Sequence, residues 1–560
     1  MKINQYLATF LVLCSNLMGA DTLMSQVSSP FPIGSEVEYL MRRENNLQMN
    51  ENTGFSHSSI RPIEYDNIKP LIDTIWEDSK EREYVVLHTK QQEVFSKKPI
   101  LKHFYKTPGN LFEVNTTDFH LTINPLLNVQ MGYQKNSDGR NGLIFNNQRG
   151  LELKGDIDDK VYFMTNIYES QTKFNTYEED WINKHKAIPG AGYYKIYDSR
   201  FTSGVNDGYD YLLATGHVGV KVSKHINVEL GHGKNFIGEG YRSLLLSDFS
   251  NNYLYLKTNV RVWKFQYQSL FAELTGLYGG PNAADRLLPK KYMAAHYLSF
   301  DVSKRLNIGL FETVILNRTG FFELQYLNPV IFYRTIEHSI GSPDNVILGT
   351  NLTYRPHPKV KFYSQFVLDE FKLGQLTSGW WANKYGIQLG ANYYNAFGVK
   401  NLDLQAEFNS VRPYTYSHND SLGNYTNFNQ PLAHPLGANF HEVIGIVNYR
   451  PHYRWWLTGQ LQYALVGYDT PLDNGNWGQN IIRPNNPHPQ DLNNTVAQGN
   501  KSNLLIGNVY VGYMLFHNLR LEANLLYRSL SQQQQTSDAF NTISFNFGVR
   551  WNVQRKLNTF

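Results

Sequence analysis

A charged stretch in the middle of the chain, residues 231–248, is the one best suited by its residue types to bind a polar ligand. Four charged residues stand there among glycines and large apolar residues: Lys234, Glu239, Arg242 and Asp248. Arginine and lysine bind carboxylates, and carboxylates accept hydrogen bonds from hydroxyls, so the set could recognise an acidic or hydroxyl-rich glycan. Charges that are buried must be paired, so the same residues could instead pin an infolded loop through internal ion pairs. The second interpretation is favoured.

A second charged set follows about ninety residues later and allows the same two interpretations. It comprises Arg334, Glu337 and Asp344. If the two stretches meet inside the protein, Arg242 or Arg334 can pair with a carboxylate of the other stretch.

Aromatic side chains in two later stretches are the better candidates for glycan contacts. They are Tyr414, Tyr416, Tyr425 and Trp477. Flat ring faces can stack on sugar rings, whereas the alternative is the aromatic girdle that membrane barrels carry at the lipid–water boundary. Both interpretations stay open.

The residue patterns give no support for catalysis or for a cofactor. Ser243 with His232, and Ser339 with His338, are the nearest serine–histidine pairs, but neither stands in a nucleophile-elbow pattern. The histidines lack metal-ligand spacing, and the glycines of residues 231–240 do not follow a nucleotide-binding pattern. Cys14 is the only cysteine, so we expect no disulfide in the mature chain. The sequence therefore predicts neither an enzyme nor a metal site nor a cofactor.

The composition of the 560 residues is typical of a transmembrane β-barrel. Aromatic residues make up 14% of the chain and charged residues only 18%, below the usual quarter, while the mean hydropathy is −0.43. No segment offers about 18 consecutive apolar residues, as a transmembrane helix would need. Lipid-facing apolar residues and lumen-facing polar residues alternate in a barrel, so the mean hydropathy of the chain reveals neither face. The net charge of +4 gives no argument for nucleic acid.

Strict alternation of apolar and polar residues identifies the strands. Residues 519–528 place leucines, alanine and tyrosine at odd positions, against arginines, glutamate and asparagine at even positions. Residues 543–553 and 401–409 repeat the pattern. Alternation of this length indicates strands with one apolar face, and segments of about 9–13 residues can cross a membrane at a tilt.

The connections between these strands alternate between short and long. Short turns are predicted at residues 124–125, 156–159, 223–225, 303–305, 355–358, 398–401, 450–453 and 517–518. Long connections are predicted at about 137–147, 171–208, 232–252, 278–291, 316–344, 372–383, 412–438, 468–502 and 530–541. Outer-membrane barrels have short periplasmic turns and long extracellular loops. About 19 candidate strands are found by this count, and since a barrel with both ends in the periplasm needs an even number, we predict 18, with 20 as the alternative.

The domain organisation predicted from these patterns has four parts. Residues 1–20 form a secretory signal peptide, residues 21–108 a small helical periplasmic region, residues 109–553 the barrel, and residues 554–560 a tail. Helical spacing in the second part predicts helices over Glu36–Asn45 and Asp66–Trp76.

Three stretches, residues 235–248, 327–345 and 367–371, resemble segments of one known family: the Wzi-type capsule-assembly outer-membrane proteins, and in particular their RemB-like gliding-motility relatives. Residues 235–248 are similar to the family's W-G-x-G…S-L-x-L-S segment, residues 327–345 to its E-x-x…P-x-N-x-x-x-G segment, and residues 367–371 to a short motif of the RemB-like branch. The resemblance implies an 18-stranded barrel, a helical bundle at its periplasmic end, and extracellular loops that fold inward and close the pore.

The resemblance also implies a function at the cell surface. We expect an outer-membrane protein that organises or binds exported polysaccharide, or that supports adhesion or gliding motility. Its expected partners are outer-membrane lipid, exported polysaccharide and other surface or motility proteins, without nucleic acid. The alternative is a porin-like channel for oligosaccharide or another nutrient.

Overall fold

The computed structural model describes residues 29–49, 57–64, 84, 109–197, 208–276, 288–318, 323–329, 332–341, 344–470, 475–534, 539–556 and 559–560. The predicted signal peptide, residues 1–20, and the predicted helix Asp66–Trp76 lie outside these residues.

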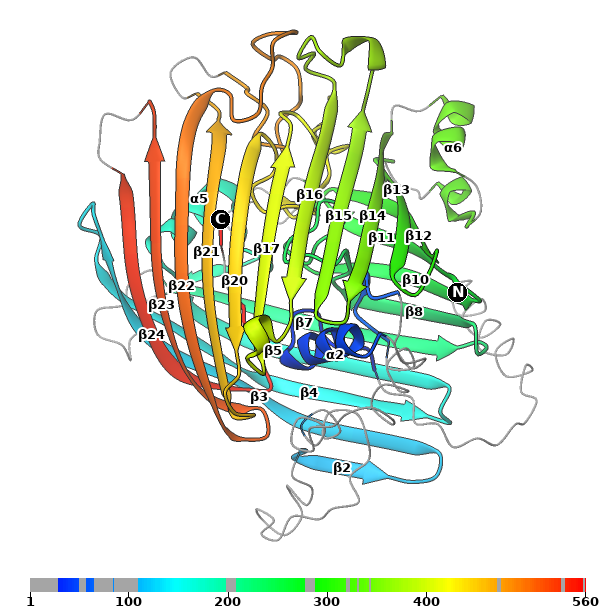
Figure 1. Cartoon of the computed structure of the whole chain (residues 1–560), viewed down its shortest axis with the longest axis vertical. Coiled ribbons are helices and arrows are strands. Elements are labelled where there is room, and N and C mark those ends of the chain that lie inside the picture. Colours follow the sequence, from blue (N-terminus) through cyan, green and yellow to red (C-terminus); the bar gives the residue numbers. More distant parts are fainter. Residues whose placement is uncertain are drawn as a thin grey trace.

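Eighteen long strands in the described part of the chain close into one antiparallel barrel, with β24 paired to β3 (Figure 1). The strands are β3 (Phe119–Asn136), β4 (Gly142–Ile157), β5 (Val161–Lys173), β7 (Gly208–Lys221), β8 (Ile226–Gly233), β10 (Tyr253–Val262), β11 (Phe265–Thr275), β12 (Lys290–Asp301), β13 (Leu306–Leu316), β14 (Asn345–His357), β15 (Val360–Glu370), β16 (Lys384–Tyr393), β17 (Leu402–Val411), β20 (Phe440–Tyr449), β21 (Trp455–Tyr468), β22 (Asn500–Phe516), β23 (Leu519–Gln532) and β24 (Phe540–Trp551). The predicted fold class and the preferred strand number are confirmed.

Shorter elements line the barrel or lie in its loops. The short strands are β1 (Ile60–Arg61), β2 (Phe112–Asn115), β6 (Lys195–Tyr197), β9 (Phe236–Ile237), β18 (Thr426–Asn427) and β19 (Gln430–Pro431). The helices are α2 (Glu36–Leu47), α5 (Thr176–His185) and α6 (Tyr333–Ile340), with 3-10 turns η1 (Leu324–Leu327), η2 (Leu373–Gln375) and η3 (Ala396–Gly398). None of the helices among the described residues is long and apolar enough to cross a membrane.

The two faces of each long strand carry opposite chemistry. In β24, Ile543, Phe545 and Phe547 point outward and are 50–54% exposed, whereas Thr542 and Ser544 point into the lumen and are buried. Large apolar residues stay exposed on the outer wall around the barrel, the pattern expected of a wall that faces lipid rather than water. The lumen side is lined by polar side chains that bond to one another, as in Asn128 to Gln148 across β3 and β4.

The connections segregate by length largely as predicted, with two corrections at the start of the barrel. The connection predicted as long at about 137–147 is only residues 137–141, because β4 begins at Gly142. The predicted turn at Asn124-Pro125 is wrong, because both residues lie inside β3. On one edge, β3 pairs with β2 up to Ile123 and with β24 from Leu127 onward. Pro125 falls between these partners, where its missing N–H breaks no ladder bond on that edge.

Helix α2 lies at the short-turn end of the barrel (Figure 1). Its Ser35 N-cap accepts a hydrogen bond from the Glu38 backbone N–H. Tyr39 and Arg43 both bond to the carboxylate of Asp403, near the start of β17. The helix observed therefore spans the segment predicted over Glu36–Asn45 and is fixed to the inner wall.

Candidate functional site

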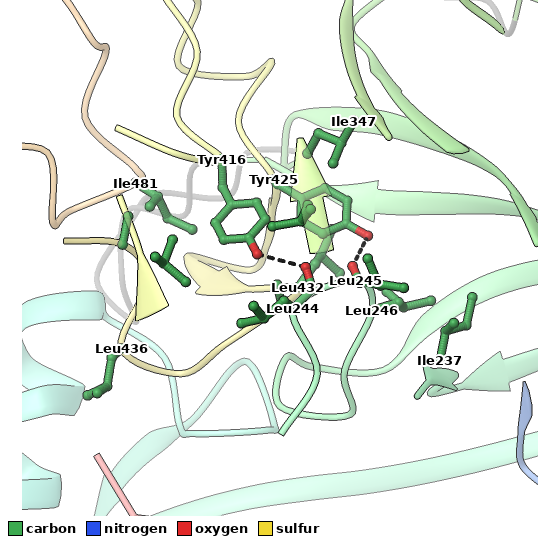
Figure 2. Packing of buried hydrophobic residues seen from close by; sticks show 14 of the residues in the cluster. Ile237, Leu244, Leu245, Leu246, Ile347, Tyr416, Tyr425, Leu432, Leu436 and Ile481 are labelled. Atoms are coloured by element: carbon green, nitrogen blue, oxygen red, sulfur yellow. Dashed lines mark hydrogen bonds between the residues drawn. The ribbon is translucent and has the colours of Figure 1, made fainter. Parts of the chain in front are cut away.

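The connection between β8 and β10, residues 234–252, folds into the lumen. Leu244, Leu245 and Leu246 are fully buried and pack in the largest apolar cluster among the described residues. Two tyrosine hydroxyls from a distant connection hold this turn, Tyr416 on the Leu244 carbonyl at 2.7 Å and Tyr425 on the Leu245 carbonyl at 2.8 Å (Figure 2). Residues 234–252, which we name the central plug, thus occupy the interior that an open channel would need.

The aromatic residues expected to offer faces to a glycan are mostly buried. Tyr414, Tyr416 and Tyr425 have no exposed surface, so no ring face is free for a sugar and none of the three lies in an interfacial girdle. Trp477 is partly buried and donates its indole N–H to Thr470. Since large aromatic rings bury well when their hydroxyls find partners, these tyrosines serve as core residues of the loops that fill the lumen.

Glu239 joins the central plug to the inner wall and to α2. Its carboxylate accepts bonds from Arg42 and Lys361, both at 2.8 Å, and from the Ser58 hydroxyl. Burial by itself would raise the pKa of Glu239, but the charges of Lys361 and Arg42 outweigh burial and hold it well below its ordinary range. Glu239 is therefore an ionised, fully partnered carboxylate.

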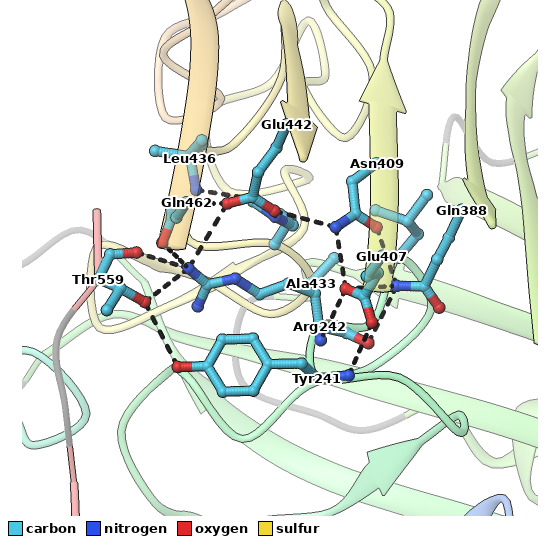
Figure 3. Close-up of polar contacts among 12 residues, drawn as sticks. Tyr241, Arg242, Gln388, Glu407, Asn409, Ala433, Leu436, Glu442, Gln462 and Thr559 are labelled. Carbon is cyan, nitrogen blue, oxygen red and sulfur yellow. Dashed lines mark hydrogen bonds and ion pairs between the residues drawn. The ribbon is translucent and has the colours of Figure 1, made fainter. Parts of the chain in front are cut away.

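Arg242 lies on the other side of the same turn and reaches three parts of the chain (Figure 3). Its guanidinium lies 3.6 Å from the Glu442 carboxylate and donates to the Thr559 carbonyl at 2.5 Å. The backbone N–H groups of Tyr241 and Arg242 donate to the two oxygens of Glu407. The charge of Arg242 is therefore satisfied by groups of the protein itself.

Lys234 and Asp248 lie at the two ends of the central plug. The Lys234 ammonium donates to the backbone carbonyls of Gly190 and Asp248, at 2.9 and 3.1 Å. Burial lowers the pKa of Lys234 to about 8, although the nearby Asp248 carboxylate opposes the shift. The lysine holds the connection after α5 against the plug.

Residues 552–556 and 559–560, which follow β24, lie in the lumen. Lys556 donates to the Pro189 carbonyl at 2.6 Å, and the Phe560 carbonyl accepts a bond from Arg528 at 3.0 Å. The Phe560 ring packs against Tyr177 and Trp181. This segment adds to the material that fills the barrel.

The second charged set lies outside the barrel and does not meet the first. Helix α6 packs through Tyr333 and Ile336 on outward-facing residues of β12, β13 and β14 (Figure 1). Arg334 pairs with Glu337 at 2.6 Å, and Asp344 pairs with Arg318 at 2.7 Å. The prediction that Arg242 or Arg334 pairs with the other stretch is wrong, because the barrel wall separates them.

A pocket of about 490 Å³ opens among the long connections and was not foreseen from the sequence. We name it the loop-end pocket. Its lining includes two partly exposed aromatic rings, two carboxylates, four amides, one imidazole and two cations: Trp181, Tyr468, Asp180, Asp469, Gln479, Asn480, Gln532, Gln534, His185, Lys184 and Arg528. A pocket of this size with a few placed polar groups on an apolar wall is typical of small-ligand sites.

Neighbouring contacts fix the chemistry of the loop-end pocket. Arg140 clamps Asp180 with two bonds of 2.9 and 3.0 Å, and Arg483 pairs with Asp469 at 2.9 Å. Lys184 lies 5.7 Å from the Tyr468 ring centroid and has no salt bridge to another described residue. The charges of Asp180 and Asp469 are thus paired with arginines, and the Lys184 ammonium remains available to a ligand in the pocket.

Helix α5 places Trp181 and His185 one turn apart, with their rings stacked at 4.0 Å. Burial and the adjacent Lys184 charge lower the pKa of His185 to about 3, so its imidazole is neutral at pH 7. The Asn175 backbone N–H bonds to the Glu178 side chain, a helix-start pattern that is readable in the sequence as N-x-x-E. That signal could have located α5, although it says nothing about where the helix docks.

The serine hydroxyls considered for catalysis bond to the backbone. Ser243 donates to the Ile237 carbonyl at 2.6 Å and Ser339 to the Ile336 carbonyl at 2.8 Å. Within the described residues, no group of three His, Cys, Asp or Glu side chains is arranged to hold a metal ion.

Comparison with solved structures matches the whole barrel. Wzi from Escherichia coli, a carbohydrate-binding β-barrel involved in group 1 capsule assembly, aligns with 95% of this chain and 100% of its own, with a TM-score of 0.52 and 13% sequence identity. The chain has a Wzi-like outer-membrane barrel fold. At 13% identity, the likeness establishes the fold alone.

The other comparisons add little. OprD from Pseudomonas aeruginosa aligns with 77% of this chain and 94% of its own, with a TM-score of 0.39 and 10% identity. No protein-family model and no curated protein matches the sequence.

Proposed function

We propose that this protein is an outer-membrane barrel that binds surface polysaccharide at its long-loop end. The observation that carries the proposal is the loop-end pocket, which opens above a lumen occupied by the protein's own loops. The barrel then serves as a rigid scaffold, and the loops it holds carry the binding residues.

The side chains of the loop-end pocket fit a carbohydrate. Amide side chains such as Gln532 and Gln534 can both donate to and accept from sugar hydroxyls, and the partly exposed rings of Trp181 and Tyr468 can pack against the apolar face of a sugar. The cation of Lys184 favours sugars that carry a carboxylate. Wzi, which shares the fold, is described as carbohydrate-binding.

The outer membrane is the location that this proposal requires, with the long connections on the outside and outer-membrane lipid around the apolar wall. Binding of exported polysaccharide there would retain it on the cell. The RemB-like resemblance suggests a role in adhesion or gliding. Such a role would then follow from attachment of the polysaccharide to the cell or from contacts with other surface proteins.

A binding measurement with one altered ring tests the proposal. Purified protein in detergent is titrated calorimetrically with a panel of neutral and uronic-acid oligosaccharides, and we expect saturable binding that favours the acidic members. Trp181→Ala should weaken binding about 30-fold, as expected when a central aromatic contact worth ~2 kcal/mol is lost.

Trp455→Ala is the matched control, because Trp455 lies on the outer wall and is 40% exposed. Its affinity should equal that of the unaltered protein. Equal affinities for Trp181→Ala and Trp455→Ala, or no binding to any oligosaccharide of the panel, would contradict the proposal.

A further inference from the structure

A second pocket lies at the opposite end of the barrel from the loop-end pocket. It has a volume of about 380 Å³ and is walled by the β7–β8 turn, the β10–β11 turn and two residues of the N-terminal segment, Pro30 and Glu64. We name it the turn-end pocket. None of its residues lines the loop-end pocket.

A carboxylate organises the floor of the turn-end pocket. Glu64 accepts bonds from the side-chain NH₂ groups of Asn227 at 2.8 Å and Asn259 at 2.6 Å. Because a carboxylate accepts only, both amides must turn their NH₂ groups toward it. Their carbonyl oxygens consequently point away from Glu64, and their orientation is fixed.

Three amide oxygens in this pocket have no hydrogen-bond partner in the part of the chain that the structure describes. The side-chain oxygens of Asn227, Asn259 and Gln266 are buried without a hydrogen bond, and Asn259 and Gln266 are only 6% and 3% exposed. Leaving a buried acceptor unpaired costs about 1–3 kcal/mol. The floor therefore presents three unpaired acceptors, two of them with a fixed orientation, that a ligand with N–H donors would satisfy.

The rim of the pocket carries the opposite charge. Lys221, Lys224 and Arg261 line the same cavity as Glu64. Lys224 is exposed and can donate to a ligand carboxylate. Amide and carboxylate oxygens would also suit a calcium ion, but three cations at the rim oppose a dication.

We propose that the turn-end pocket binds a short zwitterionic peptide, with its ammonium on the acceptors of Glu64, Asn227, Asn259 and Gln266 and its carboxylate at Lys224. The acceptor floor and the cationic rim lie within one cavity and match the two charged groups of such a ligand. In an outer-membrane barrel oriented with its long loops outside, this pocket faces the periplasm. The protein would then hold a peptide-bearing partner on the side opposite the glycan.

Calorimetric titration of the full protein in detergent with the dipeptide alanyl-alanine, whose only charges are its terminal ammonium and carboxylate, tests this proposal. We expect saturable binding, which disappears with the N-acetylated, C-amidated dipeptide because both charges are lost. Asn259→Leu and Gln266→Leu should each weaken binding about tenfold by removing one acceptor. Lys224→Ala, an exposed change with little consequence for folding, should weaken it by a similar factor.

Two controls separate the pocket from the rest of the protein. Asn392→Leu removes another buried amide whose oxygen is unpartnered but which lies outside the turn-end pocket, and it should leave dipeptide affinity unchanged. Trp181→Ala should also leave it unchanged, so that failure of the glycan proposal and failure of this one are distinguishable.

Several results would overturn the assignment. These are the absence of saturable dipeptide binding, full affinity in both Asn259→Leu and Lys224→Ala, equal binding of the blocked dipeptide, or tighter binding of calcium ions alone.

Discussion

At the residue scale, buried charged side chains and their partners hold the central plug in place. Glu239 meets two cations and a hydroxyl, and Arg242 meets a carboxylate and a backbone carbonyl. Breaking one partner of a buried pair leaves the other charged and desolvated, which costs more than the pair contributes when intact. The plug should therefore be sensitive to single substitutions at these positions.

Glu239→Ala should destabilise the folded protein by about 3–5 kcal/mol, because Arg42 and Lys361 are left as buried charges without their shared carboxylate. Urea unfolding followed by tyrosine near-ultraviolet circular dichroism measures the loss. Lys290→Ala is the comparison, since Lys290 and Glu273 form an exposed pair at the long-loop ends of β12 and β11, and such a pair is worth little. Equal stabilities of the two variants would refute the pairing described for Glu239.

Acid should weaken the plug through the same carboxylate. Because the folded protein holds the pKa of Glu239 below its ordinary value of 4.5, the unfolded chain takes up the proton first as the pH falls. The stabilisation is complete above about pH 4.5 and declines below it. The thermal unfolding midpoint should thus fall between pH 6 and pH 3 by more in the unaltered protein than in Glu239→Gln, and parallel curves would contradict this.

At the scale of elements, helix α6 covers polar residues on the outer wall of the barrel. Ser269, His296 and Glu312 face outward in one cross-strand row on β11, β12 and β13, where lipid would otherwise contact them. Helix α6 covers the row, with the Tyr333 ring 4.1 Å from that of His296 and the Arg334 N–H donating to Glu312. A charged residue facing lipid is costly, so the helix removes that cost.

Tyr333→Ala should release α6 from the wall. The ring is fully buried, and its loss is expected to cost about 3–5 kcal/mol. Trypsin cleavage after the exposed Arg334 reports the release and should accelerate at least tenfold in this variant. Ser339→Ala, a change on the same helix that removes only a local hydroxyl contact, should be cut at the original rate. Unchanged cleavage in Tyr333→Ala would show that the ring does not hold the helix.

The strands could be predicted from the sequence, whereas the docking of the loops could not. Alternation is a local consequence of the two faces of a strand, so residues 519–528 and 543–553 identify β23 and β24 directly. The helix over Tyr333–Ile340 was not predicted, since its residues fell within the long connection expected at about 316–344, and neither was the surface that it covers. Likewise, Pro125 indicates a break unless the change of partner from β2 to β24 is known.

The candidate sites show the same limit. Lys234, Glu239 and Arg242 were selected from residue type, and their partners come from segments up to 317 residues away in the sequence. The tyrosines of residues 414–425 were expected near solvent because loops usually are, but this loop folds inward. Trp181 gave no distinctive pattern, since the pocket it lines forms only when several long connections converge.

At the scale of the whole molecule, closure of the sheet predicts resistance to detergent. A closed barrel has no unpaired strand edge, so its backbone hydrogen bonds survive in sodium dodecyl sulfate until it is heated. The unheated protein should migrate on a gel differently from the boiled protein. Identical migration before and after boiling would contradict a closed barrel.

The filled lumen separates a binding scaffold from a porin-like channel, and this is the central claim of the account. Conductance of the purified protein in a planar lipid bilayer tests it most directly. We predict no steady ohmic conductance at neutral pH, because the central plug and the segment after β24 occupy the interior. Stable ohmic steps of the size of an open porin would contradict the claim.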